Sequence, residues 1–268
     1  MKIAFIGGGN MGTAILSAVL ENKLAMPDDI TVSDISEERL SFLNKTYKVQ
    51  VTSDNKTAVK GKDVIVFSIK PQTLPEVLPA LRGTLSPEQL VLTIMAGITI
   101  KTLIEGLEHR AVIRVMPNTP AQVNESMSVW TATPDVTDVQ KANASAILRS
   151  IGREIYIEDE KYLNMVTAAS GSGPAYFFLF VELLTEAAIR TGLPENMAYE
   201  LILQTMIGSG KMMRDTGMEP ARLREMVTSK GGTTAAALDV FEKRHLKETV
   251  TEAVTAAFTR ALELGGNK

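Results

Sequence analysis

The chain has 268 residues, of which 45% are hydrophobic and 22% are charged. This is enough apolar material for a buried core in one or two domains, and too much for a disordered chain. The 28 Lys and Arg residues against 31 Asp and Glu residues give a net charge of −3, so we expect neither nucleic acid nor a membrane as partner. The absence of cysteine excludes disulfides and cysteine-ligated metals. The N-terminal apolar run is too short for a secretory signal, which favours a cytoplasmic protein.

Strand-like and helix-like segments alternate through the first half of the chain. Apolar runs predict strands at residues 2–6, 30–34, 63–69, 90–95 and 112–115. Helical periodicity predicts helices at residues 11–20, 36–43, 73–81 and 99–107. Such alternation is typical of an α/β domain whose parallel sheet is covered by helices on both faces.

The pattern becomes helical throughout after about residue 160. The last strand-like run is at residues 155–157, and helix-like segments follow at residues 161–169, 174–191, 194–216, 220–227, 234–244 and 246–264. We therefore predict two domains, an α/β domain at residues 1–160 and an all-helical domain at residues 161–268. The apolar stretch 175–184 is interrupted by Glu182 and is too short to span a membrane, so we predict a buried helix there.

A glycine-rich turn follows the first predicted strand. Residues 7–12 (Gly-Gly-Gly-Asn-Met-Gly) fit the pattern G-x-G-x-x-G between a predicted strand and a predicted helix. In this context Gly7 allows a tight turn, Gly9 allows the close approach of a pyrophosphate, and Gly12 allows close packing of the helix on the strand. We therefore predict a Rossmann-type NAD(P)-binding domain with a cofactor loop made of Gly7, Gly8, Gly9, Asn10, Met11 and Gly12.

An acidic residue ends the second predicted strand. Asp34 lies 34 − 12 = 22 positions after Gly12, where a carboxylate accepts hydrogen bonds from ribose hydroxyls and repels a 2′-phosphate. Ile35 stands where an Arg often binds that phosphate, and Arg39 is the nearest basic residue. Charge alone thus favours NADH over NADPH; the alternative is that Asp34 only stabilises a turn or caps a helix.

Polar or glycine-containing turns also follow the third, fourth and fifth predicted strands. The carboxyl ends of parallel strands meet at one edge of a sheet, so these turns predict the nicotinamide end of a cofactor crevice. The predicted residues are Lys70, Pro71, Gln72, Ala96, Gly97 and Asn118.

Five motifs stand in the order typical of one enzyme family: residues 7–12, 70–72 (Lys-Pro-Gln), 116–120 (Met-Pro-Asn-Thr-Pro), 170–176 (Ser-Gly-Ser-Gly-Pro-Ala-Tyr) and 228–234 (Thr-Ser-Lys-Gly-Gly-Thr-Thr). Over essentially its whole length the chain resembles pyrroline-5-carboxylate reductase. The resemblance implies reduction of the cyclic imine Δ1-pyrroline-5-carboxylate to L-proline with NADPH or NADH, the last step of proline biosynthesis. It also implies a helical C-terminal domain that forms a homodimer, often with further assembly into a larger homo-oligomer. Departures are Met95, where the family commonly has a smaller residue, and the pair Asp34-Ile35.

A turn with Gly231 and Gly232 precedes the predicted helix 234–244. A helix N-terminus offers free N–H groups and a favourable dipole to a substrate carboxylate. The Thr234 hydroxyl is well placed to reach the ring nitrogen, and the resemblance gives the matching threonine a substrate contact. The alternative is that the glycines only end a helix and Thr234 only caps the next. We predict Thr234 as the catalytic residue and a substrate site made of Ser229, Gly231, Gly232, Thr233 and Thr234.

Other interpretations rest on few residues. His109 and His245 lie in charged helical surroundings, which predicts solvated histidines and no metal site.

A β-hydroxyacid dehydrogenase would place a catalytic Lys where this chain has Phe177. A protein that binds NAD(P) without turnover stays open from the sequence. The junction at residues 170–174 is open between a packing hinge and a part in the chemistry.

Overall fold

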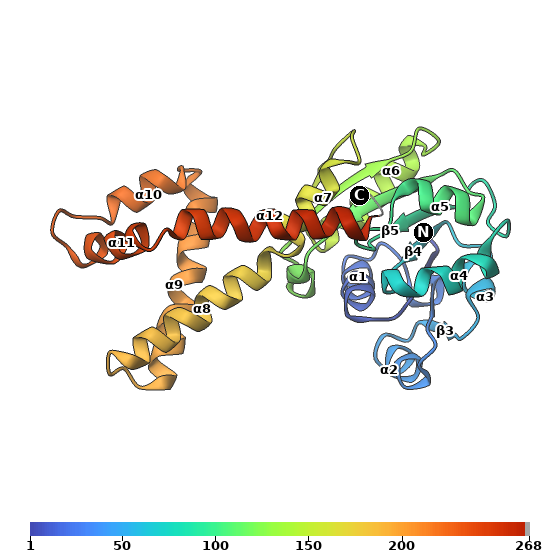
Figure 1. The fold of residues 1–268 in the computed structure, drawn as a ribbon. Helices are drawn as coiled ribbons and strands as arrows, with labels where there is room; N and C mark the ends of the chain where they lie inside the picture. Colours follow the sequence, from blue (N-terminus) through green and yellow to red (C-terminus); the bar gives the residue numbers. More distant parts are fainter. Residues whose placement is uncertain (266–268) are drawn as a thin grey trace. The chain divides into compact units, whose positions relative to one another are not determined.

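The first half of the chain folds around one eight-stranded sheet (Figure 1). The strands are β1 (Ile3–Ile6), β2 (Ile30–Ser33), β3 (Gln50–Thr52), β4 (Val64–Phe67), β5 (Leu90–Thr93), β6 (Val112–Met116), β7 (Ser126–Ala132) and β8 (Gly152–Tyr156). Their order is β3-β2-β1-β4-β5-β6-β7-β8, and every neighbouring pair is parallel except β6 and β7. The chain runs from β1 to one edge and then returns to β4 beside β1, so the topological switch point lies between β1 and β4.

Helices cover both faces of the sheet. They are α1 (Asn10–Glu21), α2 (Glu37–Tyr47), α3 (Asn55–Val59), α4 (Leu74–Leu81), α5 (Ile100–Leu107), α6 (Asp138–Ser150) and α7 (Tyr162–Val166). One apolar core packs Ile15 of α1 and Ile147 of α6 against the sheet, and a second packs Leu81 of α4 and Leu103 of α5. The predicted α/β fold is confirmed. The sheet is not purely parallel, however, and β3, α3, β7 and α6 were not predicted.

The second half of the chain is helical, as predicted. Its elements are α8 (Gly173–Arg190), α9 (Glu195–Thr216), α10 (Pro220–Met226), α11 (Thr233–Lys243) and α12 (Leu246–Leu264). In this computed structural model, which describes residues 1–265, contacts divide the chain into two compact units. Of the described residues, one unit contains 1–172 and 257–265, and the other contains Gly173–Ala256. The division falls after the predicted boundary at residue 160 because α7 packs on β6 and β7.

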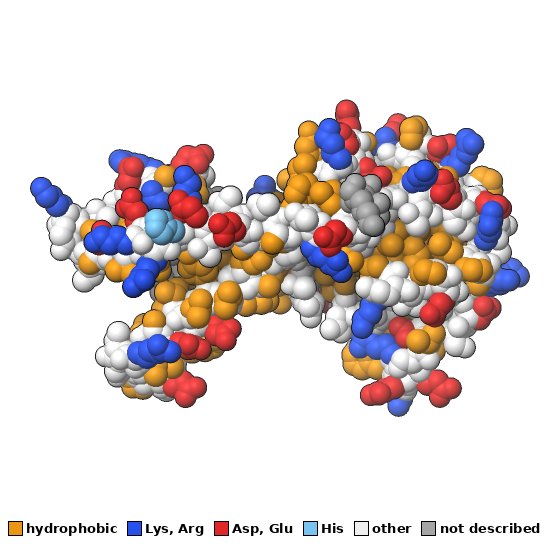
Figure 2. All heavy atoms as spheres, in the orientation of Figure 1, with side chains coloured by type: hydrophobic (Ala, Val, Ile, Leu, Met, Phe, Trp, Pro, Cys, Tyr) orange, Lys and Arg blue, Asp and Glu red, His pale blue; other side chains and the backbone are white. Residues whose placement is uncertain are grey.

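The apolar helix α8 is largely exposed within a single chain. Phe177 is 60% exposed and Phe178 is 65% exposed, so the prediction of a buried helix at residues 175–184 is wrong for one chain alone. Figure 2 shows hydrophobic side chains gathered over α8 and α12. Together with α9, these helices line an apolar groove of about 700 Å³, with Phe180 and Val250 among its lining residues. An exposed apolar surface of this size marks an interaction site.

The same surface explains a membrane-like composition. The helical stretch Tyr162–Arg190, which contains α7 and α8, is long and apolar enough to cross a membrane by length and composition, and only 11% of its most apolar window is buried. Length and composition do not distinguish a membrane span from a face that packs against another protein.

Candidate functional site

The glycine-rich turn lies at the switch point, between the end of β1 and the start of α1. Gly7 has φ +101°, and a Cβ atom there would lie 2.8 Å from Ile69 Cγ2 and 2.9 Å from Ile69 N. A Cβ at Gly12 would lie 2.7 Å from Ser68 Oγ and 2.8 Å from the Gly7 carbonyl oxygen. Both glycines are therefore required by the packing of the protein itself.

Gly9 differs from Gly7 and Gly12. Its φ of −66° suits any residue, and a Cβ there would have no protein atom within 4 Å. Gly9 is the N-cap of α1, where no side chain accepts a hydrogen bond from the helix. The open space and the uncapped helix N-terminus fit a pyrophosphate that approaches the backbone at Gly9.

Asp34 and Arg39 approach this turn from the end of β2 and from α2. The Gly8 N–H donates to Asp34 Oδ2 at 2.7 Å, and the Ser36 N–H donates to Asp34 Oδ1 at 3.0 Å. Arg39 donates to the Gly8 carbonyl oxygen and to the Thr13 hydroxyl. The carboxylate thus binds the N–H of Gly8 and the guanidinium binds its carbonyl oxygen. The predicted ribose end of the crevice therefore contains both signs of charge.

The other predicted cofactor residues follow β4, β5 and β6, at the same carboxyl edge of the sheet. Lys70 is exposed and precedes the short helical turn Pro71–Thr73, which contains Gln72. Gly97 has φ +75° and is buried, and a Cβ there would lie 3.0 Å from Leu264 at the end of α12. The topology brings these turns together with the glycine loop along one edge, as the alternating pattern predicted.

Asn118 is held in one orientation by its neighbours. Its Oδ1 accepts the Met127 N–H at 3.0 Å and the Ser126 hydroxyl at 3.0 Å. Because a backbone N–H can only donate, the amide nitrogen faces the other way, and it donates to Ser170 Oγ at 3.3 Å. Ser170 lies in a π-helical turn, Thr167–Gly171, a feature found frequently at functional sites. The motif at residues 170–176 was the only sequence signal for this contact.

The predicted substrate residues gather in the turn between α10 and α11. Gly231 has φ +73°, and Gly232 is the N-cap of α11 without a side-chain cap. Thr233 begins the helix and Thr234 follows it, so the interpretation of Thr234 as the N-cap is wrong. Within the part of the chain that the structure describes, no hydrogen bond engages the half-buried Thr234 hydroxyl. This turn offers uncapped N–H groups beside a free hydroxyl, which suits a small anion with an adjacent hydrogen-bond acceptor or donor.

The two sets of predicted residues belong to different units. The cofactor residues lie in the unit that contains the sheet, and Ser229, Gly231, Gly232, Thr233 and Thr234 lie in the helical unit. Each set is gathered within its own unit.

The two histidines have different environments. His245 is exposed, as predicted. The prediction for His109 is wrong: it is 4% exposed, and its Nε2 lies 2.7 Å from the Gln89 carbonyl oxygen. Burial lowers the pKa of His109. Its sequence neighbours concealed this, because Glu108 and Arg110 are exposed while the ring between them is buried. Within residues 1–265, no cluster of three or more His, Asp or Glu side chains could hold a metal.

Two family models match separate parts of the chain. A family model described as pyrroline-5-carboxylate reductase dimerisation matches residues 160–264, and a model described as NADP oxidoreductase, coenzyme F420-dependent, matches residues 2–97. A pyrroline-5-carboxylate reductase of Synechocystis is 38% identical over 99% of this chain and 98% of its own length.

Solved structures agree over the same length. The pyrroline-5-carboxylate reductase of Coxiella burnetii is 35% identical, covers 98% of both chains and has a TM-score of 0.87. The Plasmodium falciparum enzyme, solved with NADP bound, is 30% identical, covers 99% of this chain and 98% of its own, and has a TM-score of 0.89. With relatives of this identity matched from end to end, and with the glycine turn and the helical unit both accounted for, the chain belongs to the pyrroline-5-carboxylate reductase family.

Proposed function

We propose that this chain reduces Δ1-pyrroline-5-carboxylate to L-proline with NADPH or NADH, and so performs the last step of proline biosynthesis. The observation that carries the proposal is the end-to-end match to reductases of that name, at 38% identity over 99% of this chain. The geometry of the glycine turn supports it, because Gly9 has no reason within the protein to be glycine.

The cofactor, when bound, supplies a hydride. The chain's own contribution there is to hold the cofactor, with the peptide segment from Gly7 to Gly12 at the pyrophosphate, Asp34 at the ribose, and Lys70, Pro71, Gln72, Ala96, Gly97 and Asn118 toward the nicotinamide end. Arg39 gives the ribose end a positive charge that could also accept a 2′-phosphate. The preference for NADH that Asp34 predicts stays a prediction.

The substrate binds, in this proposal, at the turn before α11. The N–H groups of the uncapped helix N-terminus bind the carboxylate, and the Thr234 hydroxyl contacts the ring nitrogen, where the product must carry a proton. Positioning of the imine does most of the work, because a protonated imine is itself a good electrophile. Ser229, Gly231, Gly232 and Thr233 shape the turn that presents these groups.

The helical unit has a second role in assembly. The dimerisation model covers residues 160–264, which supports residues 161–268 as the substrate-binding and dimerisation domain and residues 1–160 as the cofactor domain. We propose a homodimer whose second copy covers the apolar face of α8, and dimers that assemble further. The protein works in the cytoplasm, without a membrane or nucleic acid as partner.

One assay tests the function. Purified protein is mixed with NADPH or NADH, and absorbance at the nicotinamide band is followed before and after addition of Δ1-pyrroline-5-carboxylate, with proline identified as the product. Consumption of the cofactor that depends on the imine is expected. Cofactor binding without turnover would instead favour a protein that senses NAD(P).

A further inference from the structure

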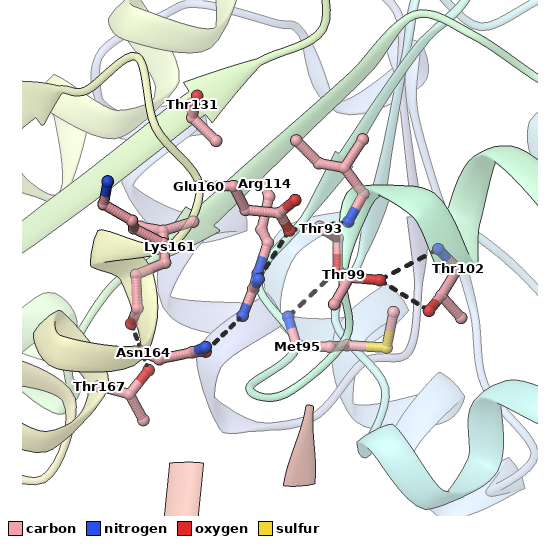
Figure 3. A network of polar contacts seen from close by, with 12 residues as sticks. Thr93, Met95, Thr99, Thr102, Arg114, Thr131, Glu160, Lys161, Asn164 and Thr167 are labelled. Carbon is pink, nitrogen blue, oxygen red and sulfur yellow. Dashed lines mark hydrogen bonds and ion pairs between the residues drawn. The ribbon is translucent and has the colours of Figure 1, made fainter. Parts of the chain in front are cut away.

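An arginine is buried in the middle of an apolar strand. Arg114 lies in β6 between Ile113 and Val115 and is 1% exposed. Figure 3 shows its guanidinium between Glu160 and Asn164. The apolar neighbours in the strand predict only a hydrophobic core, so the partners of this charge were not apparent from the sequence.

The guanidinium joins segments that are distant in the chain. Arg114 Nη1 donates to Glu160 Oε1 at 2.7 Å, and Nη2 donates to Asn164 Oδ1 at 3.4 Å. The same Glu160 oxygen accepts the N–H of Ile100, the first residue of α5, at 2.8 Å. Arg114 therefore connects β6 with the N-terminus of α5 and, through Asn164, with α7.

These segments carry residues of the proposed cofactor crevice. The loop with Ala96 and Gly97 runs directly into α5. β6 runs into the loop with Asn118, and α7 runs into the π-helical turn whose Ser170 accepts a hydrogen bond from Asn118. The ion pair and its neighbouring hydrogen bonds thus connect β6, α5 and α7. Each of these elements adjoins a loop or turn at the nicotinamide side of the proposed crevice.

Stability alone does not account for the network. The Arg114 side chain is buried, whereas the Glu160 side chain is 30% exposed. Burying the guanidinium costs desolvation, and well-packed apolar side chains in place of a buried ion pair are often neutral or more stabilising. Arg114 Nε has no hydrogen-bond partner within the described residues, which adds a further cost. What apolar side chains could not supply is the planar fork that ties two partners in fixed directions.

We propose that Arg114 is a positioning residue for hydride transfer. Through Glu160 and Asn164 it keeps the Ala96–Gly97 loop and the Asn118–Ser170 contact in register, so that the nicotinamide is held at the angle that the reaction needs. The inference rests on the proposed function for its kinetic consequence, but its effect on cofactor binding can be measured without turnover.

The main test removes both charges of the pair, so that neither is left unpaired. In the double variant Arg114→Met with Glu160→Gln, both charges are removed, and the new amide oxygen at position 160 can still accept the Ile100 N–H. The Kd for NADPH is measured by fluorescence titration, and kcat and both KM values are measured with Δ1-pyrroline-5-carboxylate. We expect a thermal midpoint near that of the wild type, a Kd and KM for NADPH raised about fivefold or more, and kcat lowered about tenfold to hundredfold. The KM for the imine should stay within about twofold, because its site lies in the helical unit.

Arg82 provides a matched control, because it pairs with Glu108 at the C-terminal end of α5. Its Nη2 lies 2.7 Å from Glu108 Oε1, but both side chains are more than half exposed. Arg82→Met should leave the Kd for NADPH and all kinetic constants unchanged.

Arg114→Lys keeps the charge beside Glu160 but lacks the fork that reaches Asn164. The Kd of this variant for NADPH should therefore lie between those of the wild type and the double variant.

Two results would overturn the inference. One is a double variant whose Kd for NADPH equals that of the wild type. The other is a loss of activity that follows the fraction of unfolded protein while both KM values stay unchanged, since this is the signature of a structural role alone. A wild-type protein that binds NADPH but does not reduce the imine would contradict the proposed function instead, and the Kd comparison would still decide the role of Arg114.

Discussion

At Gly9 an added Cβ atom would meet no protein atom within 4 Å, whereas at Gly7 it would lie 2.8 Å from Ile69 Cγ2. The fold therefore requires glycine at position 7, whereas only a bound ligand would require glycine at position 9. Gly9→Ser introduces a favoured N-cap residue and should leave the thermal midpoint unchanged or raise it. It should still weaken NADPH binding by about tenfold, because the new side chain occupies the space for the pyrophosphate.

Gly7→Ser is the control for this pair. Its φ of +101° and its contacts with Ile69 predict a loss of stability of about 1–3 kcal/mol. Thermal unfolding and fluorescence titration of both variants check the prediction. Unchanged NADPH affinity in Gly9→Ser would contradict the prediction that the pyrophosphate binds at this turn.

Thr234 carries the clearest prediction for the chemistry. If its hydroxyl contacts the ring nitrogen, Thr234→Ala should lower kcat/KM for the imine while NADPH binding stays intact. Proton transfer by a positioned group contributes about 10²–10⁴-fold, and we expect the low end or less because the imine can arrive protonated. The loss should grow as the pH rises, since less of the substrate then carries its own proton.

Matched substitutions distinguish the hydroxyl from the shape of the side chain. Thr234→Ser keeps the hydroxyl and should retain most of the activity, whereas Thr234→Val keeps the shape and should behave like Ala. Steady-state rates across the pH range are the measurement. Equal activity of the wild type and Thr234→Ala at every pH would leave carboxylate binding to the backbone of the turn, with the proton supplied by water or by the substrate.

His109 predicts a pH dependence of stability. Burial lowers the pKa of its imidazole below the ordinary value of 6.5, so the unfolded chain binds the proton more readily than the folded one. The contribution of the neutral ring is fully present above pH 6.5 and is lost as the pH falls from there through the folded pKa. The free energy of unfolding should therefore decrease from about pH 7 toward about pH 5.

His109→Gln can keep a donor to the Gln89 carbonyl oxygen but does not titrate. In chemical unfolding experiments its curve of stability against pH should be flatter than that of the wild type over this range. His245→Gln, at an exposed position, should keep the wild-type slope. A wild-type slope in His109→Gln would assign the acid sensitivity to other groups.

Among the elements, those with a strong local pattern were predictable and those without one were not. The continuous apolar runs of β1, β4 and β5 and the periodic helices α8 to α12 were predicted close to their bounds. β7, Ser126–Ala132, was missed because Ser126, Ser128 and Thr131 interrupt its apolar residues, although all three are buried. β3 and α3 are short, with few apolar residues to give a period.

The candidate site followed the same rule. The glycine turn and the strand-end loops were predicted because their positions depend on local sequence and on the topology of a parallel sheet. The partners of Arg114 were not predictable, because Glu160 and Asn164 are 46 and 50 positions away. No local pattern connects residues that only the tertiary fold brings together.

Helix α8 allows a test of the dimer. Phe178 is 65% exposed in one chain, and in the proposed dimer the second copy buries it. Phe178→Glu would place an unpaired charge in that interface, at a cost of several kcal/mol. We expect light scattering at micromolar concentration to show monomers for this variant and dimers or larger assemblies for the wild type.

Val139→Glu is the control for this experiment. Val139 is 71% exposed on α6, outside the segment that the dimerisation model matches. The variant should keep the wild-type mass. Dimers of Phe178→Glu with wild-type stability would show that another face forms the interface.

For the whole molecule, we expect folding and association to be coupled. Many apolar side chains of the helical unit are exposed in one chain, so a dimer that covers them is more stable at higher protein concentration. A tenfold increase in concentration contributes about 1.4 kcal/mol per dimer, or half of that per chain. The midpoint of reversible thermal unfolding should therefore rise by about 1–3 °C for each tenfold increase, and a midpoint independent of concentration would contradict the coupling.

The contact between α12 and the loop after β5 has a practical consequence for producing the protein. A Cβ at Gly97 would meet the carbonyl oxygen of Leu264 at 3.0 Å, and Lys268 follows 268 − 264 = 4 positions later. A purification tag fused after Lys268 would thus begin only a few residues after Leu264, which lies beside a loop proposed to hold the nicotinamide. Met1, by contrast, precedes β1 at the amino edge of the parallel strands, opposite the carboxyl edge where the cofactor crevice is proposed. A tag fused before Met1 is therefore the better design for measuring cofactor affinity.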